Sequence, residues 1–363
     1  MEELVIPLSS YSNLQIENPS KYLIDIPRVL HESMAVIDQQ MQKQPDEAGS
    51  IRRDPLVFSR LARGGKTTVL MTLFDALKEN GYVVMIVSFN GASGFIRQPH
   101  ERAEEAIMRQ IVSQLIDRSA FTEDELQHLQ CSEKVFDTFL DQQTRYGSSS
   151  QVPLIMLIDE LNILGAPLSS TASKLLQRLF LRKNRYLVFS THIPFTLSTE
   201  EELSPVDKKS IISVSSSTDM KVVQMPECND LSELRKMESC TALTGHEATI
   251  YGGIPALIFS ALKNPNFRGA RFDQAMKKFI QEFPATTTDD DLLYSLLKRF
   301  LQELFDGARN HGEPPLRFFD QFSSIPEPDK VRWPLCYLSE ILKVLKIPGF
   351  GVGETIDEVY KIP

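Results

Sequence analysis

Several features that would place a chain in a common class of protein are missing from this sequence of 363 residues. Its four cysteines lie far apart and form no C-x-x-C pair, so the sequence predicts neither a disulfide framework nor a cysteine zinc site. No apolar run reaches the roughly 18 residues that a membrane span needs. The acidic amino terminus also lacks the basic region of a signal peptide. We therefore expect a soluble intracellular protein in a reducing compartment, without a membrane partner.

The net charge and the spacing of the histidines exclude further classes. A formal net charge of −9 argues against a protein that binds nucleic acid through a basic surface all round. The six histidines include no H-x-x-x-H pair, and the chain contains no G-x-S-x-G nucleophile motif. Neither a histidine metal centre nor a serine nucleophile of that kind is predicted.

Between residues 51 and 226, short apolar runs alternate with amphipathic helical patterns. The predicted strands are 54–61, 82–89, 152–161, 185–194 and a last one near Val222 and Val223. The predicted helices are 67–81, 101–118, 131–150 and 170–184. Continuous apolar, β-branched strands separated by helices are typical of a parallel sheet that is covered on both faces. Residues 51–226 are therefore predicted to form a three-layer α/β domain.

The flanking segments have a different pattern. Residues 1–50 are predicted as a lead-in segment with one helix, whose apolar positions recur at helical spacing: Val29, Leu30, Met34, Ile37 and Met41. Residues 227–345 show helical periodicity broken by prolines and predict an α-helical second domain, or lid. Residues 346–363 are predicted as a C-terminal tail.

The first chemical motif joins the first strand of this domain to its first helix, in the stretch SRLARGGKTTVL. Phosphate binding needs backbone N–H groups that point into one concavity at a helix start, which favours glycine at Gly64 and Gly65. Lys66 would reach the β- and γ-phosphates of a nucleotide, and the hydroxyl of Thr67 would bind Mg²⁺. Thr68 follows as a further candidate for nucleotide contact.

This loop departs from the G-x-x-x-x-G-K-[ST] pattern, because Arg60 stands at the place of the first glycine. Arg63, which precedes the two glycines, either shapes the loop or touches phosphate. A bare G-K-T also fits an ordinary glycine turn at a helix start. The rest of the chain has to decide between the two interpretations.

The second motif lies at the end of the most hydrophobic strand, where Asp159 and Glu160 follow the run LIMLI. In this arrangement the aspartate holds Mg²⁺ directly or through water, and the glutamate polarises the attacking water. Acids at a strand end can also simply be solvated. The order of loop, helix, strand, helix and acidic strand favours the functional interpretation, since ligands of open α/β sheets bind outside the carboxyl ends of the strands. We therefore predict a P-loop NTPase domain that binds ATP, or another nucleoside triphosphate, with Mg²⁺.

Polar residues at the ends of two other strands are candidates for the same site. Ser190, Thr191 and His192 follow an apolar run, at a place where P-loop ATPases have a residue that contacts the γ-phosphate or the lytic water. Strand alternation favours Thr191 as the catalytic residue, with His192 as a nucleotide contact. Asn90 ends another strand and is either a turn former or a side chain of the site.

Two further features allow both a functional and a structural interpretation. Arg182 and Arg185 lie near the place where related ATPases have a charge-stabilising arginine, and Arg185 is the catalytic candidate. Basic residues at a helix end also stabilise the helix dipole, which requires no catalytic role. The stretch YGGIPALI, with Gly252, Gly253 and Pro255, either faces the nucleotide or forms a turn between helices.

Taken together, SRLARGGKTTVL, SFNG, LIDELN, FSTH and GGIP resemble the NTPase module of Crinkler effectors, which is related to the STAND and AAA-type ATPases. The resemblance runs from about residue 50 to about residue 260, and arguably through the helical region to about residue 345. Its distinctive part is R-G-G-K-T in combination with D-E-L-N. It implies that residues 64–67 bind phosphate and Mg²⁺, that Asp159 and Glu160 form the Walker B pair, and that residues 190–192 form the sensor.

The resemblance also implies a cellular setting. Crinkler proteins are effectors that oomycetes and some fungi deliver into host cells, where they are thought to act in the nucleus, on or near DNA. Host nuclear proteins or DNA are thus implied as partners, and an oligomer is compatible with the family. This chain lacks the L-x-L-F-L-A-K header of the effectors, and its tail shows no D…E-x-K constellation, so nuclease activity is not predicted.

Two functional hypotheses follow from the sequence. In the first, an ATPase couples hydrolysis to movement between the α/β core and the helical lid. In the second, the site binds nucleotide with little turnover, and the chain works as a switch or a host-interaction module. No N-K-x-D guanine reader is present, so adenine is the default base by absence and the choice between ATP and GTP stays open.

Overall fold

The computed structural model describes residues 24–43, 53–60, 64–90, 95–115, 136, 153–165, 168–191, 220–228, 230–237, 240–263, 324–327 and 330–332. The predicted helix at 131–150, apart from Phe136, and the predicted tail at 346–363 lie outside the described residues. The same holds for the part of the predicted helical domain from residue 264 to residue 323.

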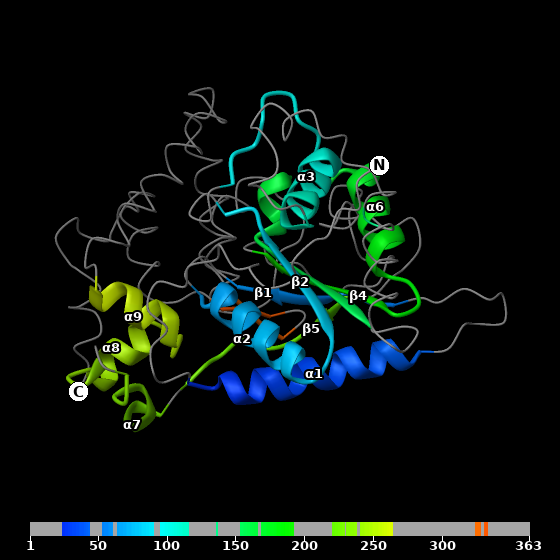
Figure 1. The fold of residues 1–363 in the computed structure, drawn as a ribbon. Helices are drawn as coiled ribbons and strands as arrows, with labels where there is room; N and C mark the ends of the chain where they lie inside the picture. Colours follow the sequence, from blue (N-terminus) through cyan, green and yellow to red (C-terminus); the bar gives the residue numbers. More distant parts are fainter. Residues whose placement is uncertain are drawn as a thin grey trace.

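A five-stranded sheet forms the centre of the described structure (Figure 1). Its strands are β1 (Leu56–Ser59), β2 (Val83–Ser88), β3 (Leu154–Asp159), β4 (Arg185–Thr191) and β5 (Lys221–Val222). They lie in the order β2-β3-β4-β1-β5, and each neighbouring pair is parallel. Because β1 lies between β4 and β5, the order of the strands in the sheet differs from their order along the chain. The predicted parallel sheet is confirmed.

Helices cover both faces of this sheet. On one face lie α1 (Ile26–Gln42) and α2 (Lys66–Glu79), and on the other lie α3 (Ala103–Leu115) and α6 (Ser170–Phe180). The sequence explains where α2 ends and α6 begins. Gly81 adopts the left-handed conformation (φ 82°) just after α2, and the Ser169 side chain accepts a hydrogen bond from the N–H of Ala172 at the start of α6. The predicted three-layer α/β architecture is confirmed.

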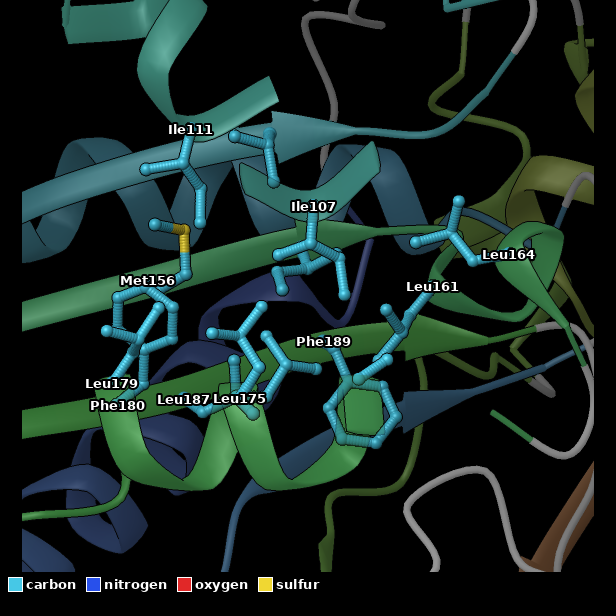
Figure 2. Packing of buried hydrophobic residues seen from close by; sticks show 14 of the residues in the cluster. Ile107, Ile111, Met156, Leu161, Leu164, Leu175, Leu179, Phe180, Leu187 and Phe189 are labelled. Carbon is cyan, nitrogen blue, oxygen red and sulfur yellow. The ribbon is translucent and has the colours of Figure 1, made fainter. Parts of the chain in front are cut away.

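The hydrophobic core has two halves, one on each face of the sheet. Alternate residues of each strand point to opposite faces, so Ile155 and Leu157 pack toward α1 and α2 while Met156 and Ile158 pack toward α3 and α6. Figure 2 shows the second half, where Ile107 of α3 lies above side chains of the sheet and of α6. Strands that are buried on both faces explain why the sequence shows continuous apolar runs instead of alternation.

The helix α1 is fastened to the sheet at the ends where β1 and β4 begin. The side chain of Arg53 is buried and donates hydrogen bonds to the carbonyls of Gln40 (2.8 Å), Met41 (3.0 Å) and Arg185 (3.2 Å). The first two carbonyls belong to the last turn of α1, and the third belongs to the first residue of β4. One guanidinium therefore satisfies the carbonyls at a helix end and joins the helix to the sheet.

Short helices follow β5. They are α7 (Leu231–Leu234), α8 (Gly245–Ile250) and α9 (Pro255–Lys263), and α8 begins with a capping box between Thr244 and Glu247. Further along, β6 (Ser324–Glu327) and β7 (Lys330–Arg332) form an antiparallel pair. None of the helices in the described ranges is long and apolar enough to cross a bilayer.

Candidate functional site

The loop that precedes α2 has the backbone geometry of a helix-capping glycine turn. Gly65 has φ 87° and caps α2, whose first residue is Lys66. An L side chain in this conformation is strained, so glycine is required by the backbone itself. A Cβ at Gly65 would also lie 3.2 Å from the Cβ of Ala256 in α9, which is tighter than ordinary contact. The first turn of α2 therefore presents its N–H groups at the carboxyl end of β1, beside the helical region.

The carboxylate of Asp159 lies at the centre of the site. Its Oδ2 accepts a hydrogen bond from the Thr67 hydroxyl (2.9 Å) and is 3.5 Å from the Ser88 hydroxyl. Its Oδ1 accepts a shorter hydrogen bond from the Ser190 hydroxyl (2.6 Å). Three different elements thus contribute hydroxyl groups to one fully buried acid.

The period of the strands explains why these hydroxyls meet. Ser88 and Asp159 are partners in the register of β2 and β3, and Ile158 pairs with Phe189, so Ser190 follows in line with Asp159. All three polar residues continue the stripe of side chains that faces α2. Because α2 begins at the same edge, Thr67 in its first turn reaches the acid.

Burial has an electrostatic consequence at this acid. Desolvation raises the pKa of the Asp159 carboxyl above its usual value, and the negative charge of Glu160 acts in the same direction. The hydrogen bonds from Ser190 and Thr67 and the positive charge of Lys66 lower the pKa and offset part of this rise. Such a carboxylate is well placed to gain from a nearby cation.

Glu160 adopts a backbone conformation that non-glycine residues rarely have. Its φ and ψ are 56° and 46°, in the left-handed region, which costs about 1–2 kcal/mol for an L residue. Its N–H donates a hydrogen bond to the Ser190 hydroxyl (2.9 Å), and the short helix η3 (Leu161–Leu164) begins directly after it. Strain of this kind is concentrated at functional sites, where the surrounding structure maintains it.

Lys66 and Arg60 are both nearly fully buried in this loop. The Lys66 Nζ donates a hydrogen bond to the carbonyl oxygen of Arg60 (3.1 Å). The Arg60 guanidinium instead donates through Nη1 to the carbonyl of Pro226. Arg60 is not among the described non-glycine residues with positive φ, so a side chain is accommodated at this position without that strain. This explains how arginine can stand at the place of the first glycine.

The other predicted site residues that the structure describes lie on or next to the same strands and helix as this cluster, but in different positions. Thr191 is buried, and its side chain belongs to the opposite stripe of β4, since Ser190 faces Asp159. The Asn90 N–H donates to the Ser88 hydroxyl (3.1 Å), which places Asn90 at the same edge of the sheet. Thr68 lies in the first turn of α2, where its carbonyl accepts a hydrogen bond from the Thr72 hydroxyl (2.8 Å). Sequence reasoning preferred Thr191 to Ser190 because it counted alternation without the strand register.

The structure does not bring Arg185 to this edge. It is the first residue of β4 and pairs with Leu154 at the start of β3, the opposite end of both strands from Asp159 and Ser190. Its Nη1 donates to the carbonyl of Leu179 (3.1 Å), and its guanidinium lies over the ring of Phe136. Arg63 and His192, the other candidates, lie outside the described residues.

The stretch YGGIPALI lies beside the glycine loop that precedes α2, hereafter the phosphate loop (residues 60–66). Gly252 and Gly253 have φ values of 61° and 65°, and α9 begins at Pro255, as expected for a glycine turn followed by a helix start. The next residue, Ala256, is the one whose Cβ approaches Gly65. The structure thus shows the turn before a helix and places it against Gly65, whereas contact with a nucleotide stays a prediction.

The described residues contain no group of three or more His, Cys, Asp or Glu side chains that could hold a metal ion by themselves. Mg²⁺ in nucleotide sites is bound by only one or two protein oxygens, together with phosphates and water. The Thr67 hydroxyl and the Asp159 carboxylate, 2.9 Å apart, fit this requirement. They are the residues that would hold the ion.

No protein family and no curated protein match the chain by sequence. Among solved structures, the Aeropyrum pernix ORC1 protein in complex with DNA is 14% identical, with 91% of this chain and 95% of that chain covered and a TM-score of 0.37. Cdc6p of Pyrobaculum aerophilum is 12% identical, with 92% and 97% covered and a TM-score of 0.36. A RuvB mutant of Thermotoga maritima is 12% identical, with 90% and 96% covered and a TM-score of 0.34.

These likenesses are too distant to carry an argument about activity or partners. The fold follows from the chain itself: a parallel sheet with helices on both faces, a glycine-lysine-threonine loop after β1, and a buried acid at the end of β3. This is the three-layer α/β arrangement that the sequence predicted for a P-loop NTPase.

Proposed function

We propose that the chain is a Mg²⁺-dependent ATPase in which hydrolysis is coupled to movement between the α/β core and the helical region. One observation carries the proposal: hydroxyls from α2 and β4 converge on the buried Asp159 carboxylate, whose pKa is also lowered by the positive charge of Lys66 at the start of α2. A buried acid with a perturbed pKa, surrounded by convergent polar groups, is a candidate for a functional site.

Each residue of the cluster has a distinct role in this proposal. Lys66 and the N–H groups of the first turn of α2 bind the β- and γ-phosphates. Thr67 and Asp159 hold Mg²⁺, which neutralises charge on the phosphates when it is bound. Glu160 accepts a hydrogen bond from the attacking water and orients it, since its left-handed turn places it just beyond the metal-binding acid. Thr191, Thr68, Asn90, Arg63 and His192 stay candidate contacts.

The position of α9 supports the coupling to the helical region. Ala256 lies against Gly65, so a change in the loop on phosphate binding is felt directly at the start of α9. In P-loop enzymes the phosphates contact the same loop atoms that Gly65 and Lys66 provide. A shift of α9 against α2 is the movement that we expect.

The alternative function is a switch that binds nucleotide with little turnover and acts as a host-interaction module of the Crinkler type. The contact between α9 and the loop also suits a switch, because binding alone would move the helix. The effector type, the host nuclear setting and a DNA partner are supported by the sequence motifs of the loop and of the D-E-L-N stretch.

The experiment that tests the function combines nucleotide-dependent thermal stabilisation with steady-state phosphate release. ATP, GTP and ADP are compared, each with Mg²⁺ and with EDTA, so that base selectivity and metal dependence are measured together. We expect Mg²⁺-ATP to raise the melting temperature and phosphate to be released. Binding without release, with or without DNA, would favour the switch.

A matched pair of variants on α2 controls this experiment. Lys66→Ala should abolish both the thermal shift and the phosphate release. Lys78→Ala removes an exposed lysine from the last turn of the same helix and should leave both unchanged. Undiminished phosphate release by the Lys66→Ala protein would contradict the proposal.

A further inference from the structure

Arg60 contacts the phosphate loop through its backbone. Its N–H donates a hydrogen bond to the carbonyl of Thr191 at the end of β4 (3.2 Å), and its carbonyl accepts one from the Lys66 Nζ (3.1 Å). Lys66 is the side chain that would bind phosphate. A change in the hydrogen bonding of Lys66 therefore reaches the Arg60 peptide directly.

The side chain of Arg60 leads away from the loop, to the connection between β5 and α7. The residue is only 3% exposed, and its Nη1 donates to the carbonyl of Pro226, 166 residues further along the chain. A guanidinium stays charged under all ordinary conditions, so its burial is tolerated only where hydrogen-bond partners are held in place. Arg60 thus ties the position of Pro226 to the position of the loop.

The two residues after Pro226 are held by two other parts of the molecule. The Glu227 N–H donates to Oδ2 of Asp25 at the start of α1 (3.1 Å), and the Cys228 N–H donates to the carbonyl of Gly253 (2.8 Å). Figure 1 shows this connection passing the start of α1 on its way to α7. Three successive residues of one short segment are therefore fixed by the phosphate loop, by α1 and by the turn before α9.

The path closes on the loop from which it started. Gly253 lies in the turn before α9, and Ala256 in the first turn of α9 is the residue that approaches Gly65. The start of α9 is thus connected to the loop twice, by direct contact at Gly65 and through the segment 226–228 that Arg60 holds.

We propose that Arg60 is a positioning residue that couples the phosphate loop to the helical region through the segment 226–228. This inference rests on the proposed nucleotide binding. When phosphate binds, the Lys66 ammonium exchanges the Arg60 carbonyl for phosphate oxygens, the Arg60 peptide shifts, and its guanidinium moves the segment 226–228 with it. Arg60, at the place of the first glycine, is then the residue through which a shift of the loop moves the segment 226–228.

Cys228 provides a native probe for this coupling. It is half-buried within the segment, whereas Cys240 is buried and serves as an internal reference for general opening of the fold. The rate at which a maleimide modifies Cys228 is measured by peptide mass spectrometry, with and without Mg²⁺-ATP. We expect nucleotide to change this rate by about fivefold or more, as for linked sites in general, while the rate at Cys240 stays the same.

Arg60→Met removes the donors of the side chain and keeps much of its length. The variant should still bind Mg²⁺-ATP, as shown by thermal stabilisation, but its Cys228 rate should no longer depend on nucleotide. Arg60→Lys keeps one donor and should restore part of the response. If the methionine variant does not fold, the lysine variant carries the test, with a reduced Cys228 response as the expected result.

Arg53→Met is the matched control. Arg53 is also a buried arginine that donates to backbone carbonyls, but those carbonyls belong to the end of α1 and the start of β4. This variant should lower the melting temperature and keep the full nucleotide response at Cys228. Equal loss of the response in both methionine variants would show that Arg60 acts only through stability and would overturn the inference.

The remaining outcomes separate this inference from the proposed function. If the wild-type protein binds no nucleotide, both are overturned. If it binds and hydrolyses ATP while the Cys228 rate never responds, or while Arg60→Met responds like the wild type, the function stands and the coupling through Arg60 is wrong.

Discussion

The two ends of the central sheet contain buried polar groups of opposite kinds. At the amino end, Arg53 donates to backbone carbonyls, and the Tyr186 hydroxyl donates to the carbonyl of Asp54 (2.5 Å). Arg53 thereby joins the end of α1 to the start of β4, and Tyr186 joins β4 to the residue segment that precedes β1. At the carboxyl end, the hydroxyls of Thr67 and Ser190 both donate hydrogen bonds to the Asp159 carboxylate.

The difference shows which end is built for stability and which for chemistry. A donor that meets a backbone carbonyl satisfies a group that the fold has to satisfy in any case. A carboxylate buried among hydroxyls, with its pKa raised by desolvation, satisfies nothing that the fold requires. Variants of the two acids at the carboxyl end should therefore affect catalysis more than stability, and variants at the amino end the reverse.

Among variants that still bind nucleotide, Glu160→Gln should have the largest effect on catalysis. The amide keeps the shape of the side chain and loses its ability to accept a proton, so phosphate release should fall by about 10²–10⁴-fold. Thermal stabilisation by Mg²⁺-ATP should persist. Glu79→Gln, an exposed change at the end of α2, is the control that should leave turnover unaffected. Wild-type turnover in the Glu160 variant would remove the catalytic role from this turn.

Asp159→Asn tests the opposition between stability and activity at a single residue. Loss of the charge proposed to bind the metal should raise the activation free energy by several kcal/mol, so turnover should fall by about 10²–10³-fold. The dependence of turnover on Mg²⁺ should also weaken. Since the buried charge is removed, the melting temperature of the apoprotein should stay the same or rise. A large drop in melting temperature would mean that the acid holds the fold together. Asp75→Asn on the exposed face of α2 is the control.

Ser190→Ala should affect both stability and turnover. The substitution leaves the buried Asp159 carboxylate without its shortest hydrogen bond and the Glu160 N–H without its acceptor, which costs about 1–3 kcal/mol of unfolding free energy. The hydrogen bond that holds the left-handed turn at Glu160 is lost, so kcat should fall about tenfold while KM changes less. Denaturant unfolding and steady-state kinetics measure the two effects. Ser190→Thr keeps the hydroxyl and should recover part of kcat.

Ser190 also shows what the sequence could and could not predict. The parallel sheet and the places of Lys66 at the start of α2 and Asp159 at the end of β3 were accessible, because apolar runs and a glycine-lysine-threonine loop are local patterns. The choice between Ser190 and Thr191 depends on which stripe of β4 faces α2, and that follows only from the register with β3. Counting from Asp159 along the aligned strands would have selected Ser190.

The place of Arg60 could not be predicted for a different reason. Its partner, Pro226, lies 166 residues away, and a local sequence pattern does not predict a hydrogen bond between a guanidinium and such a distant carbonyl. Arg185 was selected by analogy with related ATPases, and its position at the end of β4 away from Asp159 likewise follows only from the topology. Both cases show that residue types in a loop can be recognised from the local sequence, whereas long-range contacts depend on the topology of the fold.

Tyr186→Phe is the smallest perturbation and the counterpart of Ser190→Ala, because each removes one hydroxyl from the same stripe of β4 at opposite ends of the strand. Loss of the hydrogen bond to the Asp54 carbonyl should cost about 1 kcal/mol of unfolding free energy. The ring stays in place, so kcat, KM and the nucleotide-dependent thermal shift should equal those of the wild type. A loss of turnover comparable to that of Ser190→Ala would mean that the two ends of the sheet are not separate in function, and the contrast between them would fail.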